Sequence, residues 1–341
     1  MMRLVPLRTP NGQKGGQVAL AATAGAGGRV GPAAGMPGTA RRPPRAKGGA
    51  RAFARAFPFV LPSFVGVTVF LVLPVVFVLV LSFLNWSGSG PFSWAGLQNW
   101  VNIFKYDGAA HSLGVTAYYV LLNIPLQTVL ALGLAVMLNR KRRGMGFYRV
   151  LFLAPYLSTP VAMGVIWFWV FQPQNGAIDH FLGLLGINGP NWLNSSLWAM
   201  PVVAAVNIWQ YLGFNMLFFF AGLQSIPRSL YEAAEIDGAS KWRQFWRISL
   251  PLLNPTMLFV LVTDVIGSFQ VFDTLYVLTG GTGGPGDSTK VISLNIYDIG
   301  FVGTRYGEAA ALSVLLFGVV LLFSVGQFMF FKNRTTYEYS A

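Results

Sequence analysis

The chain contains 341 residues, of which 54% are hydrophobic and 10% are charged. Soluble domains carry about a quarter charged residues, so this composition excludes an ordinary water-soluble globule. The formal net charge is +13, but residues 1–56 hold ten basic residues and no acid, so the basicity belongs to one tail and does not indicate a nucleic-acid-binding domain. There is no cysteine, which excludes disulfides, thiolate metal sites and cysteine nucleophiles, and two histidines leave little room for a zinc site or a histidine-based triad.

Residues 1–56 form a basic segment that we expect to be a disordered cytoplasmic tail. Its first fifty residues are rich in Gly, Ala, Pro and Arg and contain almost no large apolar side chain. Such a segment cannot bury enough surface to offset the entropy lost on ordering. Three interpretations of this tail stay open. It could be a solvated extension, the true start could lie further along the chain, or the tail could bind anionic lipid headgroups.

Six apolar stretches follow the tail, each long enough for the roughly 20 residues that a spanning helix needs. Five carry no Asp, Glu, Lys or Arg, whereas the fifth in chain order contains Asp264 and Asp273. The sequence therefore predicts an all-α integral membrane protein with a six-helix domain over residues 57–332 and a cytoplasmic tail at 333–341. The predicted spans are residues 57–83, 113–138, 150–171, 197–223, 251–278 and 309–331.

The distribution of Lys and Arg predicts the orientation of these spans. With the N-terminus in the cytoplasm, 21 of the 24 basic residues lie on the inner side. The outer side then holds three, which are Lys105, Lys290 and Arg305. Because inner loops are enriched in Lys and Arg, we expect both termini to be cytoplasmic.

The segment between the fourth and fifth spans, residues 225–250, carries the most specific pattern in the chain. Ser229 precedes Glu232 by three residues, as in a capping box, so a helix is predicted to start there. Gly238 stands where that helix should end in a residue with positive φ. A second, basic amphipathic helix is predicted over residues 239–248, before Pro251 opens the fifth span.

The spacing in this segment resembles the EAA loop of binding-protein-dependent ABC importer permeases. The matching positions are Glu232-Ala233-Ala234, three residues, Gly238, nine residues, and then Ile248-x-Leu250-Pro251. Residues around the loop agree as well, among them Asp237. The Gly-Gly-Pro of residues 283–285 resembles the outer loop after the fifth span in the carbohydrate subfamily, the relatives of the larger subunit of the maltose permease. The resemblance extends over roughly residues 57–332 and implies the type I importer permease fold.

The resemblance also implies a set of partners for the chain. A coupling helix would dock in a cleft of a separate ATP-binding subunit, present in two copies. The other implied partners are a second permease subunit, a solute-binding protein outside the cell and the membrane lipid. No nucleic acid is expected as a partner. The residues implied in ATPase coupling are Glu232, Ala233, Ala234, Asp237, Gly238, Ile248, Leu250 and Pro251.

We expect the chain to bind no cofactor and to hydrolyse no ATP itself. A P-loop requires G-x-x-x-x-G-K-[ST] after a strand, and the sequence has no such match. The glycine-rich residues 280–286 lack the Gly-Lys-Ser/Thr ending and lie on the predicted outer side, so we interpret them as a turn-rich loop that faces the binding protein. ATP would thus be used by the partner subunit, and this chain is predicted to be no enzyme.

Polar residues within spans tend to face the interior of a helical bundle, so they predict the substrate pathway. Two stripes at helical spacing combine amide, carboxylate and aromatic side chains, which is the mixture that a neutral sugar needs. The fourth span contributes Asn207, Gln210, Tyr211 and Phe214. The fifth contributes Asp264, Gly267, Ser268 and Val271. In the maltose permease, which this chain resembles, sugar contacts come from the same two stretches.

Other interpretations remain open from the sequence. The polar groups could simply hold helices together, and we expect this of Asn123, Gln127 and Asp273. An importer of glycerol 3-phosphate would look alike but predicts a basic residue in the cavity. A proton-coupled secondary transporter could use Asp264 as its proton site, but it predicts inverted repeats and leaves the EAA loop unexplained.

Overall fold

The computed structural model describes residues 49–139, 143–173 and 175–332. The chain divides into two compact units, residues 1–59 and 60–341. Of the predicted tails, residues 1–48 and 333–341 lie outside the described residues. The structure begins a helix at Gly49, so residues 49–56 are helical rather than irregular, and α1 (Gly49–Val67) starts before the apolar run does.

Within the described residues, four helices are long and apolar enough to cross a membrane, and two bent helix pairs bring the number to six if each pair is one span. The first span, Phe57–Leu81, runs from α1 through a π-helical turn, η1 (Thr68–Val72), into α2 (Leu73–Leu81). The other three unbroken spans are α4 (Ala109–Leu138), α8 (Ala199–Ser225) and α15 (Tyr306–Lys332). Each of the four overlaps a predicted stretch, and their only Asp, Glu, Lys or Arg side chains are Glu308 and Lys332, which lie in the first and last turns of α15.

The predicted third span, residues 150–171, is not one helix. It consists of α5 (Met145–Leu153) with a 3-10 turn, η2 (Ala154–Leu157), followed at an angle of 96° by α6 (Pro160–Val170). Proline cannot continue a helix and forces the preceding residue into an extended conformation, so Pro160 causes the break.

The predicted fifth span, residues 251–278, is broken twice. An arm that begins before the predicted span, formed by α10 (Lys241–Gln244), η3 (Phe245–Ser249) and α11 (Leu250–Leu252), meets α12 (Asn254–Phe269) at 67°. Leu253 lies at this bend, between Pro251 and Pro255. The second break follows Phe269, and a separate helix, α13 (Asp273–Leu278), ends the segment.

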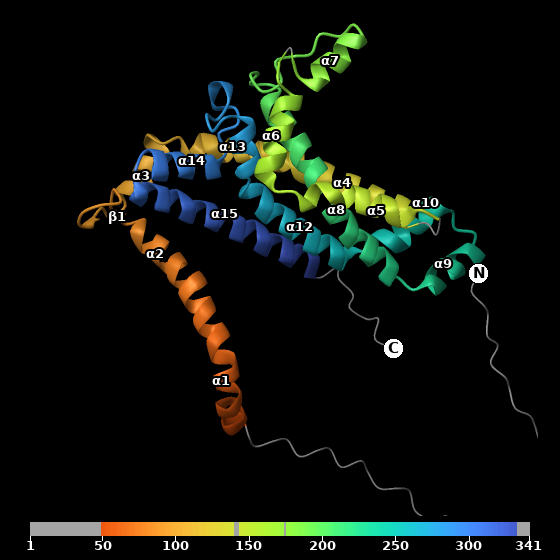
Figure 1. The fold of residues 1–341 in the computed structure, drawn as a ribbon. Helices are drawn as coiled ribbons and strands as arrows, with labels where there is room; N and C mark the ends of the chain where they lie inside the picture. The colour runs from red at the N-terminus through yellow and green to blue at the C-terminus, as the bar shows by residue number, and fades with distance from the viewer. Residues whose placement is uncertain (1–48, 140–142, 174, 333–341) are drawn as a thin grey trace, which may run out of the picture. The chain divides into compact units, whose positions relative to one another are not determined.

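The core lies between α4, α8, α12 and α15, which run side by side in Figure 1. α4 packs on α8 and α12, and α15 packs on α12 and α2. Large side chains such as Tyr119, Met216 and Phe219 are fully buried in these contacts. The exposed apolar side chains of residues 60–80 are consistent with a lipid-facing helix, because they would be costly in water.

Short elements cover the end of the bundle opposite the 225–250 segment. Arg305 pairs there with Asp107 at 2.7 Å and with Glu308 at 2.5 Å, so this predicted outer cation is neutralised by two acids. Residues 280–286 contain five glycines with positive φ, as a turn-rich loop requires. The elements are β1 (Leu84–Asn85) paired with β2 (Ser93–Trp94), α3 (Gln98–Lys105), η4 (Pro285–Asp287), α14 (Ile292–Tyr297) and η5 (Asp298–Val302). A further short helix, α7 (Ala177–Leu184), contacts α6.

We expect Gly213→Ala to destabilise the bundle, because Gly213 is the point where α8 meets α5. A Cβ at Gly213 would lie 2.0 Å from the carbonyl oxygen of Phe152, which is backbone and cannot rotate away. Overpacking of this kind costs about 1–3 kcal/mol. Gly133→Ala on α4 is the matched control, since a Cβ there meets no atom within 4 Å. Unfolding temperatures in detergent should fall for the first variant only, and equal temperatures would contradict the close approach.

Candidate coupling surface and solute cavity

The 225–250 segment folds as a helical hairpin. Its first helix is α9 (Arg228–Ile236), and the chain reverses at Gly238, whose φ is +72°. Ser240 then caps α10, its hydroxyl accepting from the backbone N–H of Arg243. The expected capping box is absent, because the N-cap of α9 is Pro227, two residues before Ser229, and Glu232 instead pairs with Arg228 at 3.0 Å.

The predicted coupling residues separate into two groups in the structure. Five lie on the hairpin, where Glu232, Ala233, Asp237 and Gly238 are exposed and Ala234 is half-buried. The other three lie in the arm that leads to α12, where Ile248 and Leu250 pack against a buried apolar cluster and Pro251 is exposed.

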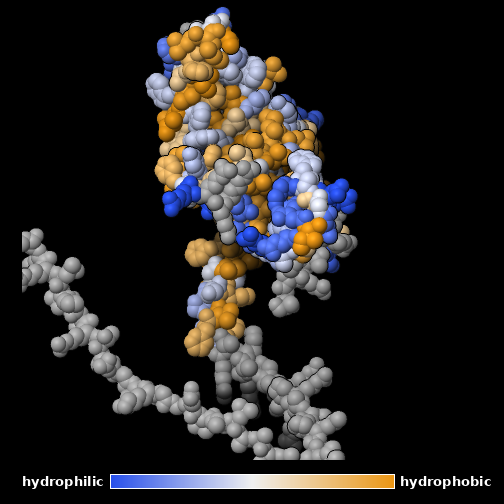
Figure 2. Space-filling model, turned by 90° about the vertical axis from the view of Figure 1, so that its right-hand side faces the viewer, coloured by the Kyte–Doolittle hydropathy of each residue, from blue (hydrophilic) through white to orange (hydrophobic). Residues whose placement is uncertain are grey.

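An apolar residue on the hairpin was not predicted from the sequence as part of this surface. Ile236, at the end of α9, is 88% exposed, and Trp242 on α10 is 72% exposed. Figure 2 looks onto this end of the molecule, where hydrophilic residues gather over α9 and α10 with apolar surface among them. The sequence does carry a signal for Ile236, because a large apolar residue between Glu235 and Asp237 on a short polar helix indicates a contact surface.

An ion pair closes the hairpin. The Lys241 ammonium donates to the carboxylate of Glu235, which joins α10 to α9. This hydrogen bond and the lysine charge lower the pKa of Glu235, so its carboxylate stays ionised at neutral pH. Gln244 supports the same turn, because its side-chain amide donates to the Ala239 carbonyl at 3.1 Å.

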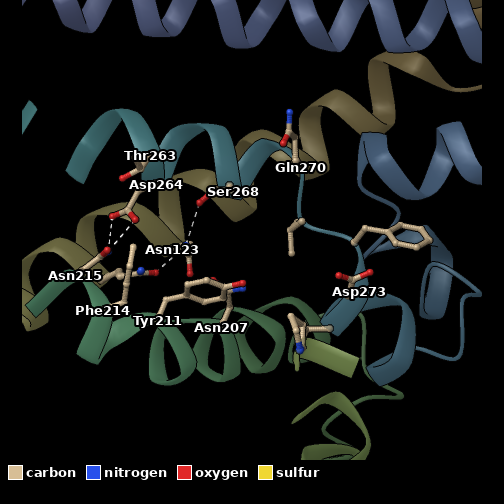
Figure 3. A pocket seen from close by; sticks show the side chains of 16 residues that line it. Asn123, Asn207, Tyr211, Phe214, Asn215, Thr263, Asp264, Ser268, Gln270 and Asp273 are labelled. Carbon is tan, nitrogen blue, oxygen red and sulfur yellow. Dashed lines mark hydrogen bonds between the residues drawn. The ribbon is translucent and has the colours of Figure 1, made fainter. Parts of the chain in front are cut away.

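A polar cavity of about 300 Å³ lies between α8 and α12 (Figure 3). Its volume falls at the lower end of the range for small-molecule sites, about 300–1,000 Å³. Seven of the eight predicted pathway residues line it, namely Asn207, Tyr211, Phe214, Asp264, Gly267, Ser268 and Val271. The structure therefore brings the two polar stripes of the fourth and fifth spans together around one space.

Two hydrogen-bonded pairs form the polar wall of this cavity, as the dashed lines in Figure 3 show. The side-chain amide of Asn215 on α8 donates to both carboxylate oxygens of Asp264, at 2.8 and 2.9 Å. Asn123 on α4 donates to the Ser268 hydroxyl at 3.1 Å. Asn215 and Asn123 are almost fully buried, so each holds its partner's polar group in a fixed direction.

Aromatic rings form another part of the wall. Tyr156 on η2 stacks on Phe214, with ring centroids 4.3 Å apart, and meets Tyr211 edge to face at 5.7 Å. η2 packs on α8, which places Tyr156 behind these two rings, although Tyr156 itself does not line the cavity. Ring faces of this kind pack against the C–H surfaces of a sugar, while the amides and carboxylates bind its hydroxyls.

The remaining predicted residue, Gln210, does not line the cavity. Its side chain is 1% exposed, and its amide donates to the Ser158 carbonyl at 3.3 Å, a group that the helix break leaves without a helical partner. Asp273 does line the cavity, although a continuous helix would turn it away, because the break after Phe269 resets the helical phase.

Asn123 and Gln127, expected to be helix contacts, also line the cavity, and Asn123 makes an interhelical contact as well. Asn215 and Thr263 are lining residues that the sequence did not single out. Two carboxylates, Asp264 and Asp273, stand among the lining residues, which include no Lys, Arg or His. Within the described part of the chain, no cluster of His, Cys, Asp and Glu could hold a metal ion.

Residues 127–332, more than half of the chain, match the family described as "Binding-protein-dependent transport system inner membrane component". The sn-glycerol-3-phosphate transport system permease protein UgpA of Agrobacterium fabrum is 37% identical over 246 residues, which cover 72% of this chain and 83% of the relative. The lactose transport system permease protein LacF of Rhizobium radiobacter is 34% identical over 281 residues, covering 81% and 93%.

The fold is similar to that of a chain in a bacterial ABC transporter involved in the import of the acidic polysaccharide alginate. The TM-score is 0.73 at 23% identity, and the match covers 84% of this chain and 99% of that one. A second structure of the alginate transporter, in complex with an alginate-pentasaccharide-bound periplasmic protein, matches with a TM-score of 0.72 at 22% identity. The chain therefore belongs to the inner-membrane components of binding-protein-dependent transport systems, and it is a multi-pass transport subunit rather than an enzyme.

Proposed function

We propose that the chain is the permease subunit of an ATP-driven sugar importer and forms half of its translocation pathway. The observation that carries this proposal is the cavity between α8 and α12, where side-chain amides, two carboxylates and aromatic rings converge. Hydroxyls of a neutral sugar would bind to Asp264 and Asn207, and the rings of Tyr211 and Phe214 would contact its C–H faces. The name of the lactose permease relative supports the same class of solute.

The proposal includes the partners and the place of the chain in the cell. Two copies of an ATP-binding subunit use ATP, one of them docking on the exposed hairpin of α9 and α10, and this chain binds no cofactor. A second permease subunit supplies the other half of the pathway, and a solute-binding protein delivers the sugar from outside. The chain lies in a bacterial or archaeal cell membrane with both termini in the cytoplasm, in keeping with its excess of inner Lys and Arg.

Capture of the tagged chain from its native host in mild detergent tests the partners. We expect an ATP-binding subunit and a second permease to co-purify, and the eluate to hydrolyse ATP. Elution of a folded chain alone, without ATPase activity, would overturn the proposal and favour a proton-coupled transporter that uses Asp264.

Import of glycerol 3-phosphate is the second candidate, because the UgpA relative is 37% identical. The charge of the cavity distinguishes the two. A phosphate at a site lined by Asp264 and Asp273, with no basic lining residue, would be repelled rather than bound.

We therefore expect the reconstituted transporter to prefer neutral sugars to sugar phosphates. Asp264→Asn should raise the uptake of an anionic solute relative to a neutral one, since it removes one negative charge and keeps the shape of the side chain. The measurement is competition between labelled neutral and phosphorylated solutes, with Thr263→Ser as a lining control of unchanged charge. Strong uptake of glycerol 3-phosphate by the wild type would instead support the second candidate.

A further inference from the structure

One side-chain hydrogen bond links the middle of α9 to the start of the fifth span. The hydroxyls of Tyr231 and Ser249 lie 2.8 Å apart. Ser249 is the last residue of η3 and is 6% exposed, and the ring of Tyr231 packs against the buried apolar cluster that contains Leu253. The bond is thus shielded from water on the side of Ser249, where a hydrogen bond holds its geometry better than at an open surface.

Ser249 stands one turn before the bend of the fifth span. The backbone N–H of Leu253 donates to the Ser249 carbonyl at 3.0 Å, and the 67° bend follows directly. Leu253 is fully buried against α8, where Gly222 leaves room for it: a Cβ at Gly222 would lie 2.8 Å from the Leu253 side chain. Leu253 is therefore a fixed point between a short cytoplasmic arm and α12.

The other side of this fixed point carries the cavity. Asp264 lies eleven residues beyond Leu253, or about 16 Å along the axis of α12 at the usual helical rise. Ser268 lies one turn further, where it accepts from Asn123 on α4. A rotation of the arm about Leu253 would consequently move Asp264 and Ser268 relative to α8 and α4.

We propose that Tyr231 is the positioning residue through which movement of the coupling hairpin reaches the solute cavity. The inference rests on the proposed function, because it presumes an ATPase subunit that moves α9. The hydroxyl of Tyr231 pulls on Ser249, the arm of residues 241–252 turns about Leu253, and α12 shifts the polar wall of the cavity. The ring of Tyr231 supplies packing, whereas its hydroxyl supplies the link, so the two roles can be separated experimentally.

The experiment uses the complete transporter, reconstituted in liposomes with its ATPase and solute-binding protein. Tyr231→Phe keeps the ring and removes the hydroxyl. We expect the ATPase subunit to co-purify in wild-type amounts, and the solute imported per ATP hydrolysed to fall about two- to tenfold, the factor that a net hydrogen-bond energy of about 0.5–1.5 kcal/mol represents. Ser249→Ala should give the same loss, and the double variant should lose no more than either single variant.

Tyr148→Phe is the matched control, because Tyr148 is a half-exposed tyrosine on α5, outside the hairpin and the arm, and its import per ATP should stay at the wild-type value. A wild-type ratio in Tyr231→Phe, or losses that add in the double variant, would overturn the role of the hydroxyl. A fall in protein yield with an unchanged ratio would do so too, since it would show a purely structural contact. Failure of the ATPase to bind the wild type would instead remove the proposed function itself.

Discussion

Replacing Gly238 with proline should release the ATPase subunit from the permease while the spanning helices stay folded. Gly238 reverses the chain between α9 and α10 at a φ of +72°, which proline cannot adopt because its ring fixes φ near −65°. The variant also removes the N–H that donates to the Glu235 carbonyl at 3.1 Å. A proline in an incompatible backbone costs about 3 kcal/mol, which corresponds to roughly a hundredfold loss of binding if docking needs the intact hairpin.

The control for this variant is Gly238→Asn, since asparagine tolerates positive φ better than other residues with a side chain. No atom lies within 4 Å of a Cβ at Gly238, so the added side chain meets no obstacle within the chain. The ATPase captured per permease in mild detergent is the quantity to compare. Equal capture by the proline variant and the wild type would mean that docking does not depend on the hairpin.

The single substitution Asn215→Leu should lower the stability of the protein more than the double substitution Asn215→Leu with Asp264→Asn. In Asn215→Leu the Asp264 carboxylate loses two hydrogen bonds of 2.8 and 2.9 Å within a membrane-spanning segment. Hydrogen bonds to charged groups contribute about 1.5–3 kcal/mol. An ionised aspartate at the centre of a spanning helix costs about 2.5–3.5 kcal/mol on insertion scales.

The variant Asn215→Leu with Asp264→Asn removes the charge that would otherwise stand unpartnered. We expect its unfolding temperature, followed by tryptophan fluorescence in detergent, to lie above that of Asn215→Leu alone. Asp264→Asn by itself should stay close to the wild type, because its side chain can still bind Asn215. If the second substitution lowers stability further in the Asn215→Leu background, the amide does not act by stabilising the carboxylate.

The sequence was sufficient to predict the hairpin and the straight spans, because both depend on local signals. Gly238 sits at a fixed distance from Glu232, and its positive φ follows from that position alone. The charge-free stretches mark α4, α8 and α15 because a bilayer demands about 20 apolar residues in a row. The break before Pro160 was open to prediction in the same way, because proline restricts the residue that precedes it, but the sequence does not give its angle of 96°.

The wall of the cavity was only half predictable, because it depends on contacts between helices. Asn215 and Asp264 are 49 residues apart, and no periodicity within either span indicates that they pair. A straight helix would point Asp273 away from Asp264, but the break after Phe269 changes the direction of every later side chain, and Asp273 lines the cavity. Gln210 shows the opposite case: its spacing placed it in the stripe, but its amide binds the carbonyl that the helix break exposes at Ser158.

The interruption of the third span also affects how the membrane barrier can be kept. Where α5 and η2 end and α6 turns away, backbone groups are free of helical partners within a segment that should cross hydrocarbon. Irregular backbone at such depth is tolerated only where protein covers it or water reaches it. Gln210 covers the Ser158 carbonyl, and Pro160 borders the cavity. Water would therefore stand close to the middle of the bilayer even between transport cycles, so a seal against protons and ions must be formed by side chains above or below this level.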